Sequence, residues 1–197
     1  MLGDVRVATW LRATVGAAHA ALAMGDTEVA AETFRSAHDR AVEVGDRRIV
    51  GTALVGLAAA ARRHGDDERC VALLVGATDE ALHGGDPTDA VAAAGMLAEM
   101  LVARGAVEEA AVVLGAGDLV EDEVGVRVDF GLAPDLGPVR ATVTGRLGEH
   151  EAARLGGDGR VIGLPAAVRR AGERLFDDTT AGSALEPTRP RTDARRR

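Results

Sequence analysis

The stretch "GDTEVAAETFRSAHDRAVEVGD", residues 25–46, contains the pattern that decides the fold. Gly-Asp opens and closes it, and the same pair returns at Gly65-Asp66 and Gly85-Asp86, while Gly105 and Gly125 continue the series. Between these glycines the apolar residues recur with helical spacing. Glycine adopts the left-handed conformation that follows a helix end, and aspartate accepts hydrogen bonds from the first amides of the next helix. The pattern therefore predicts one helix about every 20 residues and one helical hairpin about every 40.

The sequence as a whole predicts an all-α protein in four parts. Residues 5–121 are expected to form three helical hairpins, with helices near 5–24, 27–44, 47–64, 67–83, 87–104 and 107–121. Residues 122–134 break the helical pattern and are expected to form a loop. Helices near 135–146, 149–155 and 164–176 are expected to make a small C-terminal helical cap over 135–176, and the polar, Arg-rich residues 177–197 are expected to be a disordered tail.

The hairpins resemble the tetratricopeptide repeat. That motif places small, glycine, small, bulky and small residues at fixed positions. The three blocks match it with Ala18, Gly25, Ala30, Phe34, Ala37, then Ala58, Gly65, Cys70, Leu74, Ala77, then Ala98, Gly105, Ala110, Leu114, Gly117. The chain departs from the family in its longer period and in lacking the usual proline near the repeat end. The resemblance implies a repeat superhelix whose first helix in each hairpin lines a concave groove.

The C-terminal part adds a narrower resemblance. Residues 147–175 are similar to the end of the helical region in large bacterial ATP-binding transcriptional regulators of the LuxR and antibiotic-regulator types, through Leu147-Gly148-Glu149, Gly159-Arg160, Leu164 and Ala167-Val168. In those regulators an ATPase domain precedes this region, and a DNA-binding domain lies at either end. The resemblance implies the interaction and sensing portion of such a regulator.

The composition excludes several classes of function. All 23 basic residues are Arg, which is typical of a high-GC bacterial genome, and the absence of Lys removes Walker A and Schiff-base chemistry. One Cys in the chain gives no internal disulfide and indicates a reducing compartment. The longest apolar stretch, residues 49–61, is about 13 residues and too short to span a bilayer. The expected location is the cytoplasm, without a membrane partner.

A group of metal-ligating residue types at 62–70 and 83 is interpreted as structural. It consists of His64, Asp66, Asp67, Glu68, Cys70 and His83. His64 and His83 are expected at opposite ends of a helix about 25 Å long, so they cannot share an ion. Cys70 takes the position of Ala30 and Ala110, where a small side chain packs between helices. No metal or other cofactor is predicted.

Three other motifs fail on geometry or spacing. In "SAHD", residues 36–39, Ser36 and His38 point to different faces of a helix. "HEAAR", residues 150–154, has Arg154 where the zinc motif requires His. The Gly-rich stretches 115–120 and 156–163 are expected at a helix end and in a connector between short helices, and neither follows a strand. The sequence thus predicts a protein that is not an enzyme.

The predicted binding surface is the concave groove. Its candidate partner-binding residues are Arg12, Val15, His19, Thr52, Val55, Arg62, Arg63, Met96 and Glu99. We expect a peptide or protein partner there, unless the chain's own C-terminal helices fill the groove. The alternative function is a small-molecule sensor with its ligand between the repeats and the cap.

Two further interactions are considered. An apolar N-terminal end with Val7, Trp10 and Leu11 makes a homo-oligomer plausible. The body is acidic, and residues 187–197 carry five Arg and one Asp, so nucleic acid is expected only as a weak partner of the tail.

Overall fold

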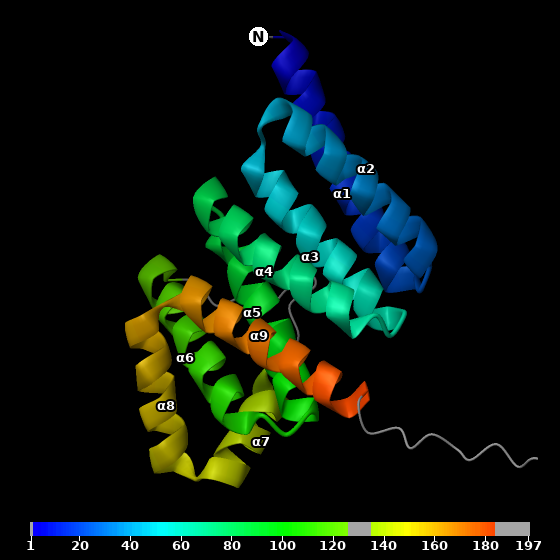
Figure 1. Ribbon diagram of the computed structural model, residues 1–197. Coiled ribbons are helices and arrows are strands. Elements are labelled where there is room, and N and C mark those ends of the chain that lie inside the picture. The colour runs from blue at the N-terminus through cyan, green and yellow to red at the C-terminus, as the bar shows by residue number, and fades with distance from the viewer. Residues whose placement is uncertain (1, 126–134, 184–197) are drawn as a thin grey trace, which may run out of the picture.

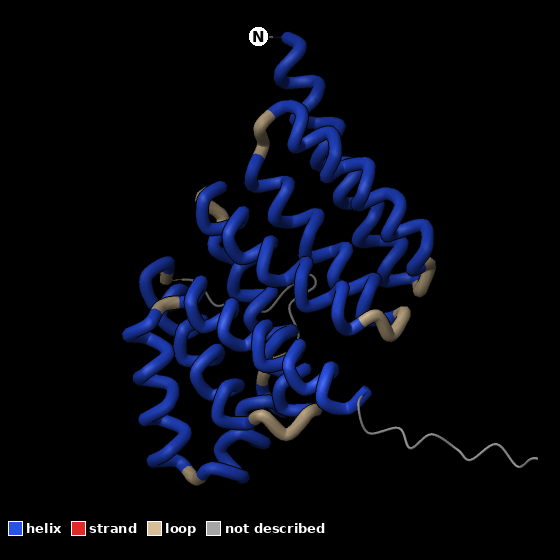
Figure 2. Tube along the Cα trace, in the orientation of Figure 1, coloured by secondary structure: helices blue, strands red, loops and turns tan. Residues whose placement is uncertain are grey.

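A computed structural model describes residues 2–125 and 135–183, and that part of the chain is helical without strands (Figures 1 and 2). Its helices are α1 (Leu2–Met24), α2 (Thr27–Val44), α3 (Arg47–Arg63), α4 (Asp67–Gly84), α5 (Pro87–Ala103), α6 (Val107–Val124), α7 (Gly137–Leu147), α8 (Glu149–Ile162) and α9 (Leu164–Ser183). The predicted all-α class is confirmed. Among the described helices, none is both long and apolar enough to cross a membrane.

The turns between α1 and α6 follow the glycine series. Gly45 and Gly85 end their helices with φ of 75°, and each donates its amide to carbonyls of the last helical turn. The other glycines of the series also have positive φ. Asp46 and Asp66 accept the amide hydrogens of Ile49 and Arg69 as expected of helix caps, whereas Asp26 and Asp86 make no such side-chain bond.

Small residues form most of the core between these helices. Ala18, Ala58 and Ala98, which lie 40 positions apart, are all fully buried. Phe34 is fully buried as well, and its ring occupies the space that a Cβ on Gly56 would need. Small residues at these contacts let the helix backbones approach closely, so the six helices stack as three successive hairpins (Figure 1).

The cap helix α8 lies along α6, and glycines make the contact possible. A Cβ on Gly115 of α6 would overlap the backbone of Gly156, and a Cβ on Gly159 would overlap the carbonyl of Val112. The expected connector at 156–163 is therefore wrong, because α8 runs through the glycines to Ile162. The stretch 115–120 likewise lies inside α6 and not at its end. Packing against the partner helix offsets the low helix propensity of glycine in both places.

The last helix crosses the third hairpin. Figure 1 shows α9 running over α4, α5 and α6, and it packs against all three. Residues 177–183, expected as disordered tail, belong to this helix, and residues 122–124, expected as loop, belong to α6. The rest of the predicted loop, 126–134, and of the predicted tail, 184–197, lies outside the described residues.

Candidate functional site

The predicted groove along α1, α3 and α5 is only partly open. Val15, Val55 and Met96 are 7%, 1% and 4% exposed, so the prediction that they line an accessible surface is wrong. The physical reason is that α3 packs directly against both α1 and α5. Apolar side chains between these helices consequently become core.

Polar residues of the same predicted set join neighbouring hairpins. Arg62 of α3 forms an ion pair with Glu99 of α5, and Thr52 donates a 2.6 Å hydrogen bond to the carboxylate of Asp89. Burial raises the pKa of Asp89, and the hydrogen bond from Thr52 opposes that shift. Arg63 of α3 joins the preceding hairpin, because its guanidinium group donates a hydrogen bond to the carbonyl of Leu22 in α1. These contacts indicate a structural role, since each joins successive hairpins.

His19 and Arg12 complete the predicted set. The imidazole of His19 lies 5.1 Å from the ring of Phe34, its Nε2 is buried without a partner among the described residues, and burial lowers its pKa. Arg12 is exposed on α1. The structure thus places the nine residues on α1, α3 and α5 but leaves few of them available to a partner.

The expected apolar N-terminal end is also smaller than predicted. Leu11 is fully buried and Val7 is half-buried, because α1 packs against α2 and α3. Trp10 remains 45% exposed.

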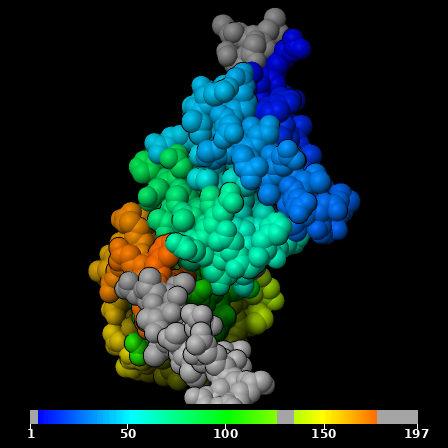
Figure 3. Space-filling model, turned by 45° about the vertical axis from the view of Figure 1, so that its right-hand side comes forward, coloured from blue at the N-terminus to red at the C-terminus, as the bar shows by residue number. Residues whose placement is uncertain are grey.

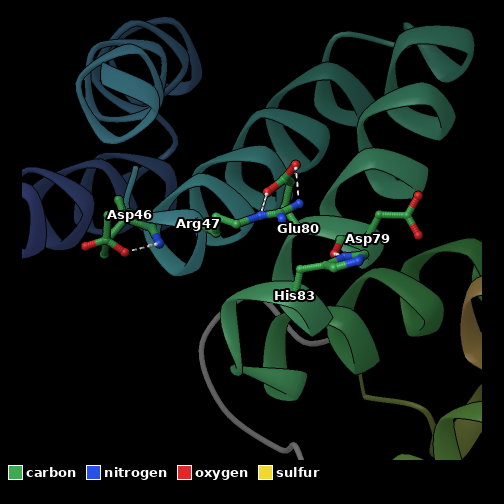
Figure 4. A network of polar contacts seen from close by, with 6 residues as sticks. Asp46, Arg47, Asp79, Glu80 and His83 are labelled. Atoms are coloured by element: carbon green, nitrogen blue, oxygen red, sulfur yellow. Dashed lines mark hydrogen bonds and ion pairs between the residues drawn. The ribbon is translucent and has the colours of Figure 1, made fainter. Parts of the chain in front are cut away.

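The residues once considered as metal ligands take structural positions. His64 follows the last residue of α3, and its Nδ1 lies 3.0 Å from the Ala60 carbonyl oxygen. Figure 4 shows the corresponding contact of His83 with the Asp79 carbonyl, beside the paired hydrogen bonds from Arg47 of α3 to Glu80 of α4. Within residues 2–125 and 135–183 no three metal-ligating side chains gather.

Cys70 and the hydrolase-like residues offer no reactive geometry. The Cys70 thiol is fully buried, contacts the sulfur of Met100 and has its pKa raised by burial to about 11. His38 contacts Asp39, and Ser36 makes no hydrogen bond to either in the described structure. Arg154 pairs with Glu151 and Asp158 on its own helix.

An open depression lies between α2 and α4, and residues of α3 form its floor. It has a volume of about 360 Å³, and we call it the α2–α4 crevice. Figure 3 shows the face on which α2 and the α3–α4 turn lie together. The lining residues are Glu28, Ala31, Glu32, Arg35, Leu57, Ala60, Ala61, His64, Asp66 and Arg69. Its floor is apolar, whereas its rim is charged.

The rim charges lack partners of opposite sign. The carboxylates of Glu28 and Glu32 and the guanidinium groups of Arg35 and Arg69 are exposed, and none forms an ion pair within the part of the chain that the structure describes. Elsewhere on the molecule, arginines pair readily across helices, as Arg160 does with Asp122. The rim charges are therefore available to pair with a bound segment.

The position equivalent to the α2–α4 crevice one hairpin further along is filled by α9. Adding 40 to the crevice residues gives Val71, Val75, Arg104 and Glu109 among others. The first two lie within 3.4 Å of where a Cβ on Gly172 of α9 would be. Arg104 donates to the carbonyl of Leu175, and Glu109 pairs with Arg174. The same location thus holds a helix in one case and is open in the other.

Sequence reasoning missed the α2–α4 crevice, although a signal for it exists. Arg35 occupies the position where the next hairpin has Val75, which lies beside Gly172 of α9. A charged residue in one block at a position that is apolar in the next indicates that one copy is buried and the other exposed.

A second depression lies between α6, α7 and α8. This cap cleft has a volume of about 560 Å³ and includes Leu114, Val143 and Gly156 in its lining. Arg140 pairs with Asp118 across it. It lies between the hairpins and the cap, where the alternative small-molecule prediction placed a ligand.

Comparison with protein-family models, with curated proteins and with solved structures gave no match to this chain.

Proposed function

We propose that this protein is a non-catalytic interaction module of the tetratricopeptide type, with a 40-residue period, that binds a segment of a protein partner in the α2–α4 crevice. The observation that carries the proposal is the open crevice beside an equivalent position that the chain's own α9 fills. Because α2, α3 and α4 follow one another in the same order as α4, α5 and α6, we expect them to pack a helix in the same way.

The regulatory setting of the proposal rests on the residues at 147–175. Their similarity to the end of bacterial transcriptional regulators favours a sensor role in the cytoplasm. In the described structure α2 and α4 make no direct contact, so an occupant between them can change their separation. That change would alter the curvature of the helical stack and so shift the position of a neighbouring domain or protein that contacts it.

A pull-down from the native lysate tests the proposal. The bait carries Arg35→Ala and Arg69→Ala in the crevice, and the matched control carries Arg12→Ala on the opposite side of the stack. Circular dichroism checks that both variants keep the wild-type helicity. We expect a partner that wild type and the Arg12 variant capture and the crevice variant loses. Loss with the Arg12 variant alone would move the binding surface to the α1–α3–α5 face.

The cap cleft supports a second candidate function, the sensing of a small molecule. Its volume of about 560 Å³ is that of a ligand site, and residues of the third hairpin and of the cap line it together. A thermal-shift screen with metabolites tests this, because a ligand that binds the folded state raises Tm. Val143→Trp places a large side chain in the cleft. If the ligand binds there, this variant should remain folded and show no increase in Tm with the ligand.

A further inference from the structure

We infer that the partner segment in the α2–α4 crevice is an amphipathic helix with a bulkier packing face than α9 and a basic edge that lies along α2. This inference rests on the proposed function and specifies the chemistry of its partner. Its template is the way in which the chain fills the equivalent position with α9.

The packing face of α9 is narrow and built from small residues at its centre. Leu164, Ala167, Val168, Ala171 and Leu175 are buried and lie on one helical stripe. At Gly172 a Cβ would lie only 3.2 Å from Val75 and 3.3 Å from Val71, so the residue there has to be small. The surface of α4, α5 and α6 on which α9 packs is called the α9 seat. Its larger side chains, such as Val71 and Val75, require small residues at the centre of α9.

The floor of the α2–α4 crevice has the opposite character. Forty positions on from Ala31, Ala60 and Ala61, the chain has Val71, Met100 and Leu101, while Leu57 of the crevice floor matches Leu97. Ala60 and Ala61 are already buried, but Ala31 is half-buried, so a copy of α9 placed in the crevice would pack less closely there than α9 packs on Val71. Such a gap forfeits packing energy. Leu, Met or Phe at the central positions of the incoming helix would fill the space that the alanines leave.

The charges around the crevice select the edge of that helix. In the α9 seat, Arg169 approaches Asp79 of α4 at 3.5 Å and Arg174 approaches Glu109 of α6 at 3.4 Å. The α2 side of the crevice has Glu28 and Glu32, both exposed and unpaired within the described chain. Arginines or lysines on the incoming helix would pair with these two acids.

The opposite wall of the crevice prefers an acid. Where the α9 seat has Glu109, the crevice has Arg69, so the second edge of the partner helix carries Asp or Glu. The α2 wall also carries Arg35, and the α4 wall also carries Asp66, which accepts the Arg69 amide at the start of α4. Reversing the helix would nevertheless move its basic edge from Glu28 and Glu32 to Arg69, which favours one orientation. Charge complementarity thus favours one direction of the partner helix, and packing determines the size of its central residues.

Two synthetic peptides of equal charge test the inference. The first has the sequence of residues 164–176, and the second has the same sequence with Ala167→Leu, Ala171→Leu and Gly172→Leu. Both carry a fluorophore, and their anisotropy is measured against the full-length protein. We expect the second peptide to bind at least about tenfold more tightly than the first. A scrambled version of the second peptide controls for non-specific apolar binding.

Protein variants locate the binding. Ala31→Val installs the residue found 40 positions on, at a half-buried site, and should weaken the second peptide several-fold. Ala61→Leu likewise installs the residue found 40 positions on, at a buried site, and should also weaken binding of the second peptide. The Tm of this variant is measured in parallel to check that it folds. Glu28→Gln with Glu32→Gln should weaken binding and flatten its dependence on salt. Glu123→Gln, exposed on α6, should change nothing.

The outcomes separate the inference from the proposed function. Equal binding of the two peptides, or binding that ignores every crevice variant, overturns the inference. If the pull-down partner is nevertheless lost with Arg35→Ala and Arg69→Ala, the proposed function stands with a partner of another kind. If neither peptide nor lysate partner depends on the crevice, both are wrong. Concentration-dependent dimerisation that the crevice variants abolish, without peptide binding, would assign the crevice to a second copy and also overturn the inference.

Discussion

Replacement of single glycines in α8 tests the close contact between this helix and α6. Gly159 is buried, and a Cβ there would overlap the Val112 carbonyl oxygen and lie 2.9 Å from its carbon and 3.0 Å from the Ala116 nitrogen. Ordinary contacts begin at 3.4 Å, and backbone atoms cannot rotate away, so the two helices must separate. Gly159→Ala should lower the free energy of unfolding by about 2 kcal/mol.

Gly157 in the same helix supplies the matched control. It is exposed, and a Cβ there would meet nothing within 4 Å. Gly157→Ala should therefore raise the free energy of unfolding by up to about 1 kcal/mol, since alanine favours the helix. The two variants should differ by about 3 kcal/mol, or by roughly 6–12 °C in Tm.

The assay uses two probes, because a stack of hairpins can unfold in parts. Far-UV circular dichroism reports all helices, while the fluorescence of the single Trp, Trp10 in α1, reports the distant end. We expect Gly159→Ala to lower the Tm measured by circular dichroism more than the Tm measured by Trp10 fluorescence. A Gly159→Ala protein as stable as Gly157→Ala by both probes would refute the described α6–α8 contact.

Three further predictions concern single side chains. Cys70, buried and with its pKa raised to about 11, should react with iodoacetamide at pH 8 at least about 100-fold more slowly in the native protein than in urea, and equal rates would contradict its burial. Burial lowers the pKa of His19, so the unfolded state binds the proton more readily; the free energy of unfolding should fall as pH drops below 6.5, and His19→Leu should reduce that fall in urea titrations. Thr52→Val removes the donor to Asp89 and should cost about 1–2 kcal/mol in the same assay, whereas an unchanged midpoint would show that water replaces it.

The glycine series allowed the six helices of the hairpins to be predicted from sequence, because a left-handed turn after a helix is a local requirement. The buried small residues Ala30, Cys70 and Ala110 were likewise predictable from their shared spacing. The course of α8 through Gly156 and Gly159 was not. Local propensity argues against a helix there, and the compensating contact comes from α6, far away in the sequence.

The predicted groove was wrong for a related reason. Val15, Val55 and Met96 were assigned to an open face by their position in the motif, although each is apolar. How closely successive hairpins approach depends on side chains from both, and in this chain alanines bring them into contact. The docking of α9 was equally unpredictable, since the α9 face is complementary to a surface made by three other helices.

The difference between the two equivalent positions also bears on how the proposed partner would bind. Val75 lies beside Gly172 of α9 at the position where the α2–α4 crevice has the exposed Arg35. Permanent burial of unpaired charges costs several kcal/mol, so a helix fixed there for the life of the protein would be expected to face apolar residues instead. Charged walls remain hydrated when the crevice is empty and require matching charges when it is occupied. Such a surface suits an occupant that binds reversibly, and the affinity of that occupant should fall as the salt concentration rises.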